Sequence, residues 1–296
     1  MHLTRMELTA ISDEIGRLSC LQELILCNNL LPLLNPAVFN LRALKVLDYA
    51  NNRVRVLPPM VEQLTNLVTL QLQQNQLHDL PDELGKLPRL TEAYLQCNLI
   101  ERLPPHIEGC SSLAVLNLAE NQLRALPDQL CNVPLVELYV HDNKLPHLPA
   151  AIGNWQRLRF LWAHKNHIGA LPPSVGQCRL LTSLYLQFNA LTELPVELAH
   201  CASLQVLALD HNRIGTIPVE LCAGLTALRS WRMHNNDPLH VVPRQITEMP
   251  ALTWMSLHEC SLPLKITYFE NCALRMTEII ERCEAKATTT TTTTTK

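Results

Sequence analysis

Side chains that can bind a metal ion or exchange a proton recur in this chain at intervals of 23 or 24 residues. The column reads His141, His164, Gln187, Asp210, His234 and His258. A zinc-type site needs three or four ligands that converge at about 2.1 Å. Gln187 interrupts the run, and nothing else in the column supplies a missing ligand. We therefore expect no metal site here, but a polar, pH-sensitive rim.

Other candidate chemistry finds little support. Glu92 and Glu137 occupy equivalent positions two repeats apart, too far for an acid–base pair, and are better interpreted as solvated charge. Cys27 and Cys97 lack the neighbouring pattern that would lower the pKa of a thiol. The sequence also contains neither a Gly-rich phosphate loop nor a nucleophile elbow. We predict that the chain is not an enzyme and needs no cofactor.

A repeat, LxxLxLxxNxL, must position these side chains, and in most copies LPxxLxxL follows it. Its asparagine falls at positions 29, 52, 75, 98, 121, 143, 166, 189, 212 and 236, and Cys260 takes the same place once more. The LxL step predicts a short strand with one buried face. The asparagine amide can satisfy backbone groups of the turn that follows. The Leu-Pro step favours an extended or 3₁₀ return path.

One such unit cannot bury its leucines, whereas stacked units share a continuous core. We predict an α/β repeat solenoid, a horseshoe with a parallel sheet on its concave face and a mostly irregular or 3₁₀ convex side. Residues 1–266 form eleven repeats and an N-terminal half repeat, 267–287 an amphipathic capping helix, and 288–296 a disordered poly-Thr tail. The open N-terminal edge predicts contact with another protein or copy, or marks the tail of a longer sequence.

The outward columns of the predicted sheet contain seven of the thirteen Phe, Trp and Tyr residues. Leucine already fills the core, so these rings predict a binding surface, where aromatic residues are enriched. Strands lie about 4.8 Å apart, so Tyr139, Trp162 and Tyr185 on successive strands could stack side by side. Alternatively, the rings merely cover one another and stiffen the sheet.

Charged residues flank this aromatic centre. The acidic flank contains Glu92, Glu120, Glu137 and Asp142, and the basic flank Lys165, Arg232 and His234. This arrangement suits a mixed-charge protein surface. The predicted protein-binding residues are Tyr94, Tyr139, Phe160, Trp162, Tyr185, Phe188, His141, His164, Arg232 and Trp254.

Composition and cysteine placement indicate a compartment. A net charge of −3 gives no reason to expect nucleic acid or anionic lipid as a partner. No apolar stretch approaches the ~18 residues of a membrane span, and the first residues do not resemble a signal peptide. Cys110, Cys178 and Cys201 occupy a place that leucine takes in other repeats, so we interpret them as core hydrophobes. Reduced thiols favour the cytoplasm.

The 23-residue LxxLxLxxNxLxxLP pattern resembles the leucine-rich repeat family over residues 3 to about 266. Its regular Leu-Pro step looks like the intracellular class of Scribble-type scaffolds and Ras-group proteins. The resemblance implies a non-enzymatic adaptor that binds a signalling protein, such as a small GTPase or a phosphatase or kinase subunit. The alternative is the recognition arm of a larger enzyme, a kinase or a ubiquitin ligase.

Overall fold

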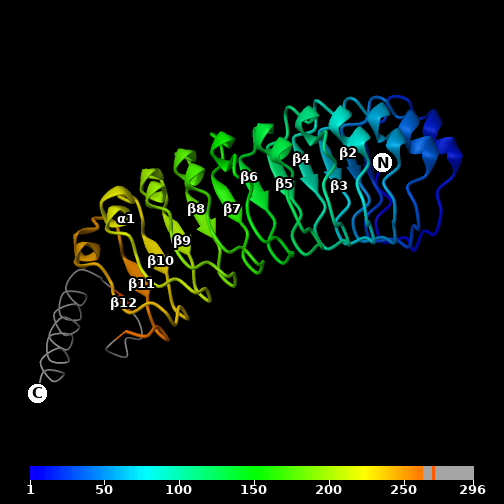
Figure 1. Cartoon of the computed structure of the whole chain (residues 1–296). Coiled ribbons are helices and arrows are strands. Elements are labelled where there is room, and N and C mark those ends of the chain that lie inside the picture. The colour runs from blue at the N-terminus through cyan, green and yellow to red at the C-terminus, as the bar shows by residue number, and fades with distance from the viewer. Residues whose placement is uncertain (263–268, 271–296) are drawn as a thin grey trace, which may run out of the picture. The chain divides into compact units, whose positions relative to one another are not determined.

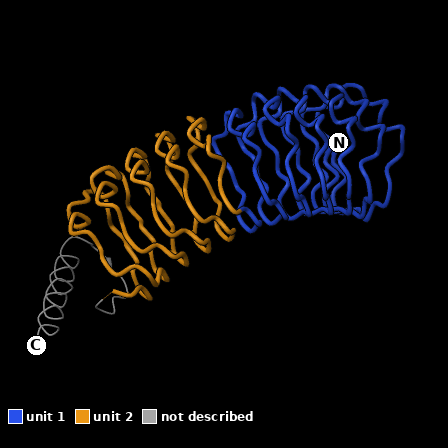
Figure 2. The backbone as a smooth tube through the Cα atoms, in the orientation of Figure 1, with its two compact units in different colours: residues 1–145 blue, residues 146–296 orange. Residues whose placement is uncertain are grey.

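Each repeat forms a three-residue strand, a turn, and a return path with a short helix, mostly 3₁₀ (Figure 1). The computed structural model describes residues 1–262 and 269–270. It consists of two units, residues 1–145 and 146–296, which we call the first and second unit (Figure 2). Among the described residues, no helix combines the length and the apolar character that crossing a membrane requires.

In the first unit, each strand pairs in parallel with the next strand along the chain. The strands are β1 (Glu23–Ile25), β2 (Val46–Asp48), β3 (Thr69–Gln71), β4 (Glu92–Tyr94), β5 (Val115–Asn117) and β6 (Glu137–Tyr139). The 3₁₀ helices on the return paths are η1 (Asp13–Arg17), η2 (Pro36–Asn40), η3 (Pro59–Gln63), η4 (Asp82–Lys86), η5 (Ile107–Gly109) and η6 (Asp128–Asn132). The register aligns one buried residue per strand, as in Leu24, Leu47 and Leu70.

The second unit continues this pattern. Its parallel strands are β7 (Phe160–Trp162), β8 (Ser183–Tyr185), β9 (Val206–Ala208), β10 (Ser230–Arg232) and β11 (Trp254–Ser256). Its helices are η7 (Ile152–Asn154), η8 (Pro173–Gln177), η9 (Val196–His200), α1 (Val219–Gly224) and η10 (Arg244–Glu248). The predicted solenoid fold, with a parallel sheet on one side and 3₁₀ turns on the other, is confirmed.

The structure describes only two residues of the predicted C-terminal helix. Phe269–Glu270, inside the range predicted as a capping helix, forms β12 and pairs antiparallel with β11. The rest of that predicted helix, residues 267–268 and 271–287, and the poly-Thr tail, 288–296, lie outside the described residues. Both therefore remain predictions.

The repeat asparagines act as an internal hydrogen-bond ladder. The Nδ2 group of Asn121 donates to the carbonyls of Leu95, Leu118 and Ala119 at 3.0 to 3.1 Å, and its Oδ1 accepts from the Ile100 N–H at 2.9 Å. In the last repeat, the thiol of Cys260 takes this place and donates to the Met233 carbonyl at 3.3 Å. The Asn121 amide satisfies backbone groups of its own turn, as the sequence predicted, and it also joins that turn to the preceding repeat.

Directly before each ladder residue, the backbone adopts the left-handed conformation. The residues concerned have φ values between 50 and 59° and are Asn28, Asn51, Gln74, Cys97, Glu120, Asp142, Lys165, Phe188, His211, Asn235 and Glu259. None of them is glycine, although this region of φ disfavours bulky side chains. The ladder bonds on either side of the turn compensate for the strain.

We expect Gly176→Ala to lower the free energy of unfolding by about 2 kcal/mol, within the range for overpacking. A Cβ at Gly176 in η8 would lie 2.2 Å from the Glu197 carbonyl oxygen in η9, so the backbone of one turn must shift. The control is Gly169→Ala, where a Cβ meets nothing within 4 Å. Urea unfolding followed by circular dichroism should show a lower free energy of unfolding for Gly176→Ala and an unchanged one for Gly169→Ala. Equal midpoints for the two variants would contradict this packing of the turns.

Candidate functional site

The first and third residues of the strands face out of the sheet, and the middle residues face the core. On β6, for example, Leu138 is fully buried, whereas Glu137 and Tyr139 are half-buried. Two small residues of the third column, Ala208 and Ser256, are instead completely covered. The outward columns that the sequence predicted are therefore present, and larger neighbours overlie their smallest members.

In the first unit, the predicted tyrosines point their hydroxyls at carboxylates on the same strand. The Tyr139 hydroxyl donates to Glu137 Oε2 at 2.6 Å, and the Tyr94 hydroxyl lies 3.5 Å from Glu92 Oε2. Burial, helped by these carboxylates, raises the pKa of both phenols, so they stay protonated. Each ring is thus held in a fixed orientation beside an acidic group.

In the second unit, Trp162 and Tyr185 form an aromatic pair. They are register partners on β7 and β8, and their ring centroids lie 5.1 Å apart at an interplanar angle of 60°. Trp162 also lies 6.2 Å from the ring of His164. Phe160, the first residue of β7, is half-buried. The predicted contact between neighbouring strands is present for this pair, with the rings tilted.

A second group of rings runs across the following repeats and consists of Phe188, His211, His234 and His258. Phe188 stacks on His211 at 4.1 Å and 11°, His211 meets His234 edge-on at 5.5 Å, and His234 stacks on His258 at 4.2 Å and 13°. We call these four residues the ring row. Sequence reasoning missed His211, although it directly precedes Asn212 just as Phe188 directly precedes Asn189.

Asp210 and Ser256 flank His234 in the ring row. His234 Nε2 lies 3.6 Å from Asp210 Oδ2, and its Nδ1 lies 2.9 Å from the hydroxyl of the fully buried Ser256. Burial lowers the pKa of His234 against the opposing effect of Asp210, and His258, His211 and Arg232 lower it further. The imidazole is therefore neutral at neutral pH.

The remaining predicted residues lie on the same outward columns of their own units. In the second unit, the Arg232 guanidinium lies 5.8 Å from the Trp254 ring centroid, a cation–π distance. In the first unit, His141 is half-buried just after β6. The predicted set thus divides between the two units, with Tyr94, Tyr139 and His141 in the first.

The cysteines behave as the sequence predicted. The thiols of Cys110, Cys178 and Cys201 are buried and donate to carbonyls of the preceding repeat at 3.1 to 3.3 Å. Burial raises the pKa of Cys110 and of Cys201 to about 12. Burial, with the nearby Glu120, also raises the pKa of the Cys97 thiol. These groups are packing residues or weak acids, and not activated nucleophiles.

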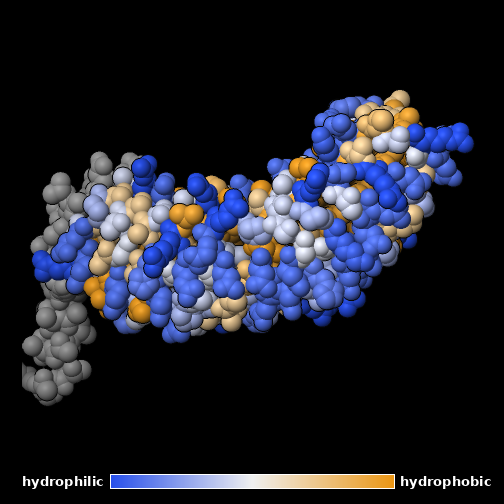
Figure 3. All heavy atoms as spheres, turned by 90° about the horizontal axis from the view of Figure 1, so that it is seen from above, coloured by the Kyte–Doolittle hydropathy of each residue, from blue (hydrophilic) through white to orange (hydrophobic). Residues whose placement is uncertain are grey.

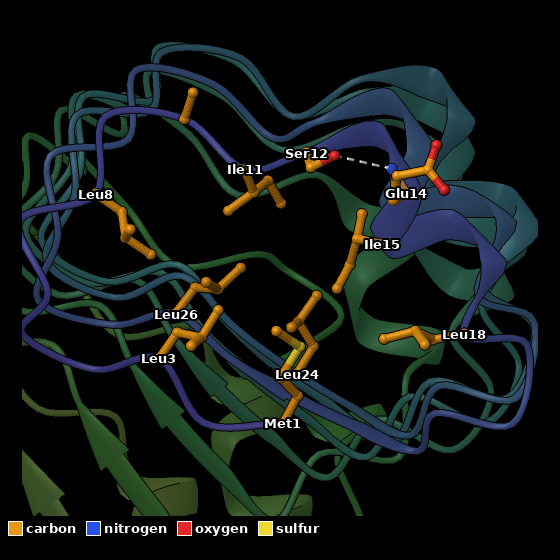
Figure 4. Close-up of a pocket in the computed structure, with 11 residues that line it drawn as sticks. Met1, Leu3, Leu8, Ile11, Ser12, Glu14, Ile15, Leu18, Leu24 and Leu26 are labelled. Carbon is orange, nitrogen blue, oxygen red and sulfur yellow. Dashed lines mark hydrogen bonds between the residues drawn. The ribbon is translucent and has the colours of Figure 1, made fainter.

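An apolar pocket of about 450 Å³ lies at the N-terminal end of the first unit (Figure 4). Leu3, Leu24 and Leu26 point into it from the strand side, and Ile11 and Ile15 from the return path. Leu24 and Leu26 are completely buried, whereas Leu3 is partly exposed and Leu18, which also lines the pocket, is 45% exposed. Self-association through this end remains a prediction.

The side of the molecule that carries the 3₁₀ turns has a different surface. It is mainly hydrophilic with scattered apolar side chains (Figure 3). Met60 in η3, Val196 in η9 and Val219 in α1 are among the exposed hydrophobic residues. These are single aliphatic residues, whereas the sheet side of the second unit presents rings that contact one another.

Comparison with known proteins supports the repeat assignment. A leucine rich repeat family model matches residues 19–77 and 179–237. No curated protein matches the chain in sequence.

Solved structures with the same fold come from several organisms. The Leptospira interrogans LRR protein LIC12759 is 28% identical, with a TM-score of 0.68 over 88% of this chain and 78% of that one. The ectodomain of the plant receptor kinase GASSHO1/SCHENGEN3 from Arabidopsis thaliana, in complex with CASPARIAN STRIP INTEGRITY FACTOR 2, is 27% identical, with a TM-score of 0.72 over 88% of this chain and 35% of that one. An internalin (inlF) from Listeria monocytogenes, 22% identical, shares the fold with a TM-score of 0.77 over 88% and 74% of the two chains. The two matched segments are similar to the leucine-rich repeat family, and the described fold is that of a leucine-rich repeat solenoid.

Proposed function

We propose that the chain is a protein-binding module whose partner contacts the outward side of the sheet in the second unit. One observation carries this proposal: Trp162 packs against Tyr185, and the ring row continues over the following repeats, on a side where the core needs no rings. Aromatic residues on an exposed face with polar neighbours are typical of the residues that contribute most to binding energy.

The charges around these rings favour a folded protein as the partner. The first unit presents Glu92 and Glu137 beside its tyrosines, and the second presents Arg232 beside Trp254. Each of these charges favours a partner surface that carries the opposite charge. The solved structure of GASSHO1/SCHENGEN3, 27% identical to this chain, is a complex with CASPARIAN STRIP INTEGRITY FACTOR 2, which supports a binding function for this fold.

We further propose an adaptor in the cytoplasm with a signalling protein as its partner, such as a small GTPase or a phosphatase or kinase subunit. The 23-residue repeat class with its Leu-Pro step supports this class of partner. The exposed thiol of Cys20 and the buried thiols of Cys110 and Cys201 support a reducing compartment. The proposed role is non-enzymatic, since the described thiols with shifted pKa values are weaker acids than a free cysteine.

Affinity capture from a native lysate tests the proposal, with bound proteins identified by mass spectrometry. The baits are the wild-type chain, the Trp162→Ala/Tyr185→Ala variant, and Val196→Ala as a control on the 3₁₀ side, where Val196 is 47% exposed. We expect a partner that wild type and Val196→Ala retain and the double variant loses. Identical partners on all three baits would overturn the proposed face.

A further inference from the structure

Three potential metal ligands from two consecutive repeats meet beside the sheet of the second unit. One ligand atom from each of Asp210, His211 and His234 lies within 4.8 Å of the other two. Asp210 and His211 follow β9, and His234 follows β10, so the parallel stacking of repeats brings them together. The histidine column in the sequence lacked a third convergent ligand. His211, next to Asp210 along the chain, supplies it.

Asp210 is a buried carboxylate whose charge is only partly compensated. The residue is 5% exposed, and its Oδ1 atom has no hydrogen-bond partner among the described residues. Its Oδ2 atom lies 3.6 Å from His234 Nε2. A buried charge without a partner is costly, and a bound cation removes that cost. Two ligand atoms of a tetrahedral zinc ion, at bonds of about 2.05 Å, lie about 3.3 Å apart. The distance between Asp210 Oδ2 and His234 Nε2, 3.6 Å, is close to this value.

Ser256 orients the imidazole of His234 as a metal ligand requires. The Ser256 hydroxyl lies 2.9 Å from His234 Nδ1 and is completely buried on β11. When Nδ1–H donates to this hydroxyl, the lone pair of Nε2 faces Asp210. Metal-bound histidines in proteins are almost always fixed by such a hydrogen bond from the second ring nitrogen.

Other side chains around the three ligands make interactions that a bound cation must replace or that oppose its charge. The Asn235 side-chain amide donates to His211 Nε2 at 3.1 Å, so coordination by that nitrogen replaces this bond. The Arg232 guanidinium opposes any cation, but it lies over the Trp254 ring. The ring of His258 stacks on the ring of His234 at a centroid distance of 4.2 Å. The carboxylate of Asp210 supplies the negative charge that offsets Arg232.

We propose that Asp210, His211 and His234 bind a divalent transition-metal ion such as Zn²⁺. Two imidazoles and a carboxylate suit zinc, cobalt or nickel, whereas magnesium and calcium prefer sites made of oxygen ligands. Three protein ligands leave a fourth position for water. The site goes beyond the proposed protein-binding function and does not depend on it.

The test uses the full chain, purified without a polyhistidine tag, and titrated with Co²⁺ by visible absorption and with Zn²⁺ by calorimetry. We expect one equivalent of each ion to bind. Asp210→Asn and His234→Gln should each weaken binding at least ~10-fold, and Ser256→Ala by about 10-fold through loss of ligand orientation. His167→Gln, which removes an exposed histidine of the same unit, should leave binding unchanged.

A wild-type chain that binds no more Co²⁺ than the Asp210→Asn/His234→Gln variant would overturn the proposal. An equal loss in His167→Gln would also overturn it. Circular dichroism and urea unfolding in a chelator separate metal loss from misfolding. Because Asp210→Asn removes a buried charge, we expect its unfolding midpoint without metal to match or exceed that of wild type. Zinc should raise the urea unfolding midpoint of the wild-type chain and leave that of Asp210→Asn unchanged.

Discussion

Replacing Asn121 with alanine is expected to lower the free energy of unfolding by about 3 kcal/mol or more. The substitution removes four hydrogen bonds and leaves the Ile100 N–H without a partner. Each unsatisfied buried group costs about 1–3 kcal/mol. The two adjacent turns keep backbone bonds such as the one from the Gln122 N–H to the Ile100 carbonyl, but they lose the side-chain link between them. Urea unfolding monitored by circular dichroism measures the change in the free energy of unfolding.

Asn132→Ala provides the matched control, since it makes the same chemical change at an exposed position of the same unit. Its effect should stay within about 0.5 kcal/mol. Asn121→Asp adds a second comparison, because it keeps the acceptor for Ile100 and removes the donors. We expect it to be destabilised as well. If Asn121→Ala lowered the free energy of unfolding no more than Asn132→Ala does, the asparagine ladder would not be a source of stability.

Affinity for the captured partner should fall at least ~30-fold, or about 2 kcal/mol, in the Trp162→Ala/Tyr185→Ala variant. Aromatic residues at the centre of an interface often contribute this much or more. The two rings contact each other at 5.1 Å, so their losses should not add as independent terms. Calorimetry with the single and double variants measures both the affinity and the coupling.

The fold should survive these substitutions, because both rings lie on the outward columns and neither fills the core. Circular dichroism and the urea midpoint check this directly. Val196→Ala, on the 3₁₀ side, serves again as the control and should leave the affinity unchanged. If the double variant bound as tightly as wild type, the aromatic pair would only cover and stiffen the sheet.

Much of the fold could be predicted because its determinants are local and repeated. The period of the asparagines fixed the strands, the Leu-Pro step indicated the 3₁₀ return paths, and the ladder bonds of Asn121 follow from its amide chemistry. Cys260 was also assigned correctly to the ladder position, where its thiol donates to the Met233 carbonyl. Each of these features depends on contacts between a repeat and its neighbour, which the period makes identical along the chain.

The candidate site was less predictable, because it depends on how side chains from neighbouring repeats turn toward one another. His211 sits in a left-handed position before Asn212, and no sequence rule for glycine or asparagine indicated that conformation. The backbone there directs its ring between Phe188 and His234. The tilt of Trp162 on Tyr185 and the burial of Ser256 beneath its neighbours likewise arise from packing between columns.

The most direct test of the proposed binding face is site-specific photo-crosslinking. Benzoyl-phenylalanine replaces Tyr185 on the outward column of β8 in one variant and Val196 on η9 in another, and each is irradiated with the captured partner. We predict a crosslinked complex from position 185 and none from position 196. Crosslinking from position 196 alone would contradict the account, because the partner would then contact the 3₁₀ side.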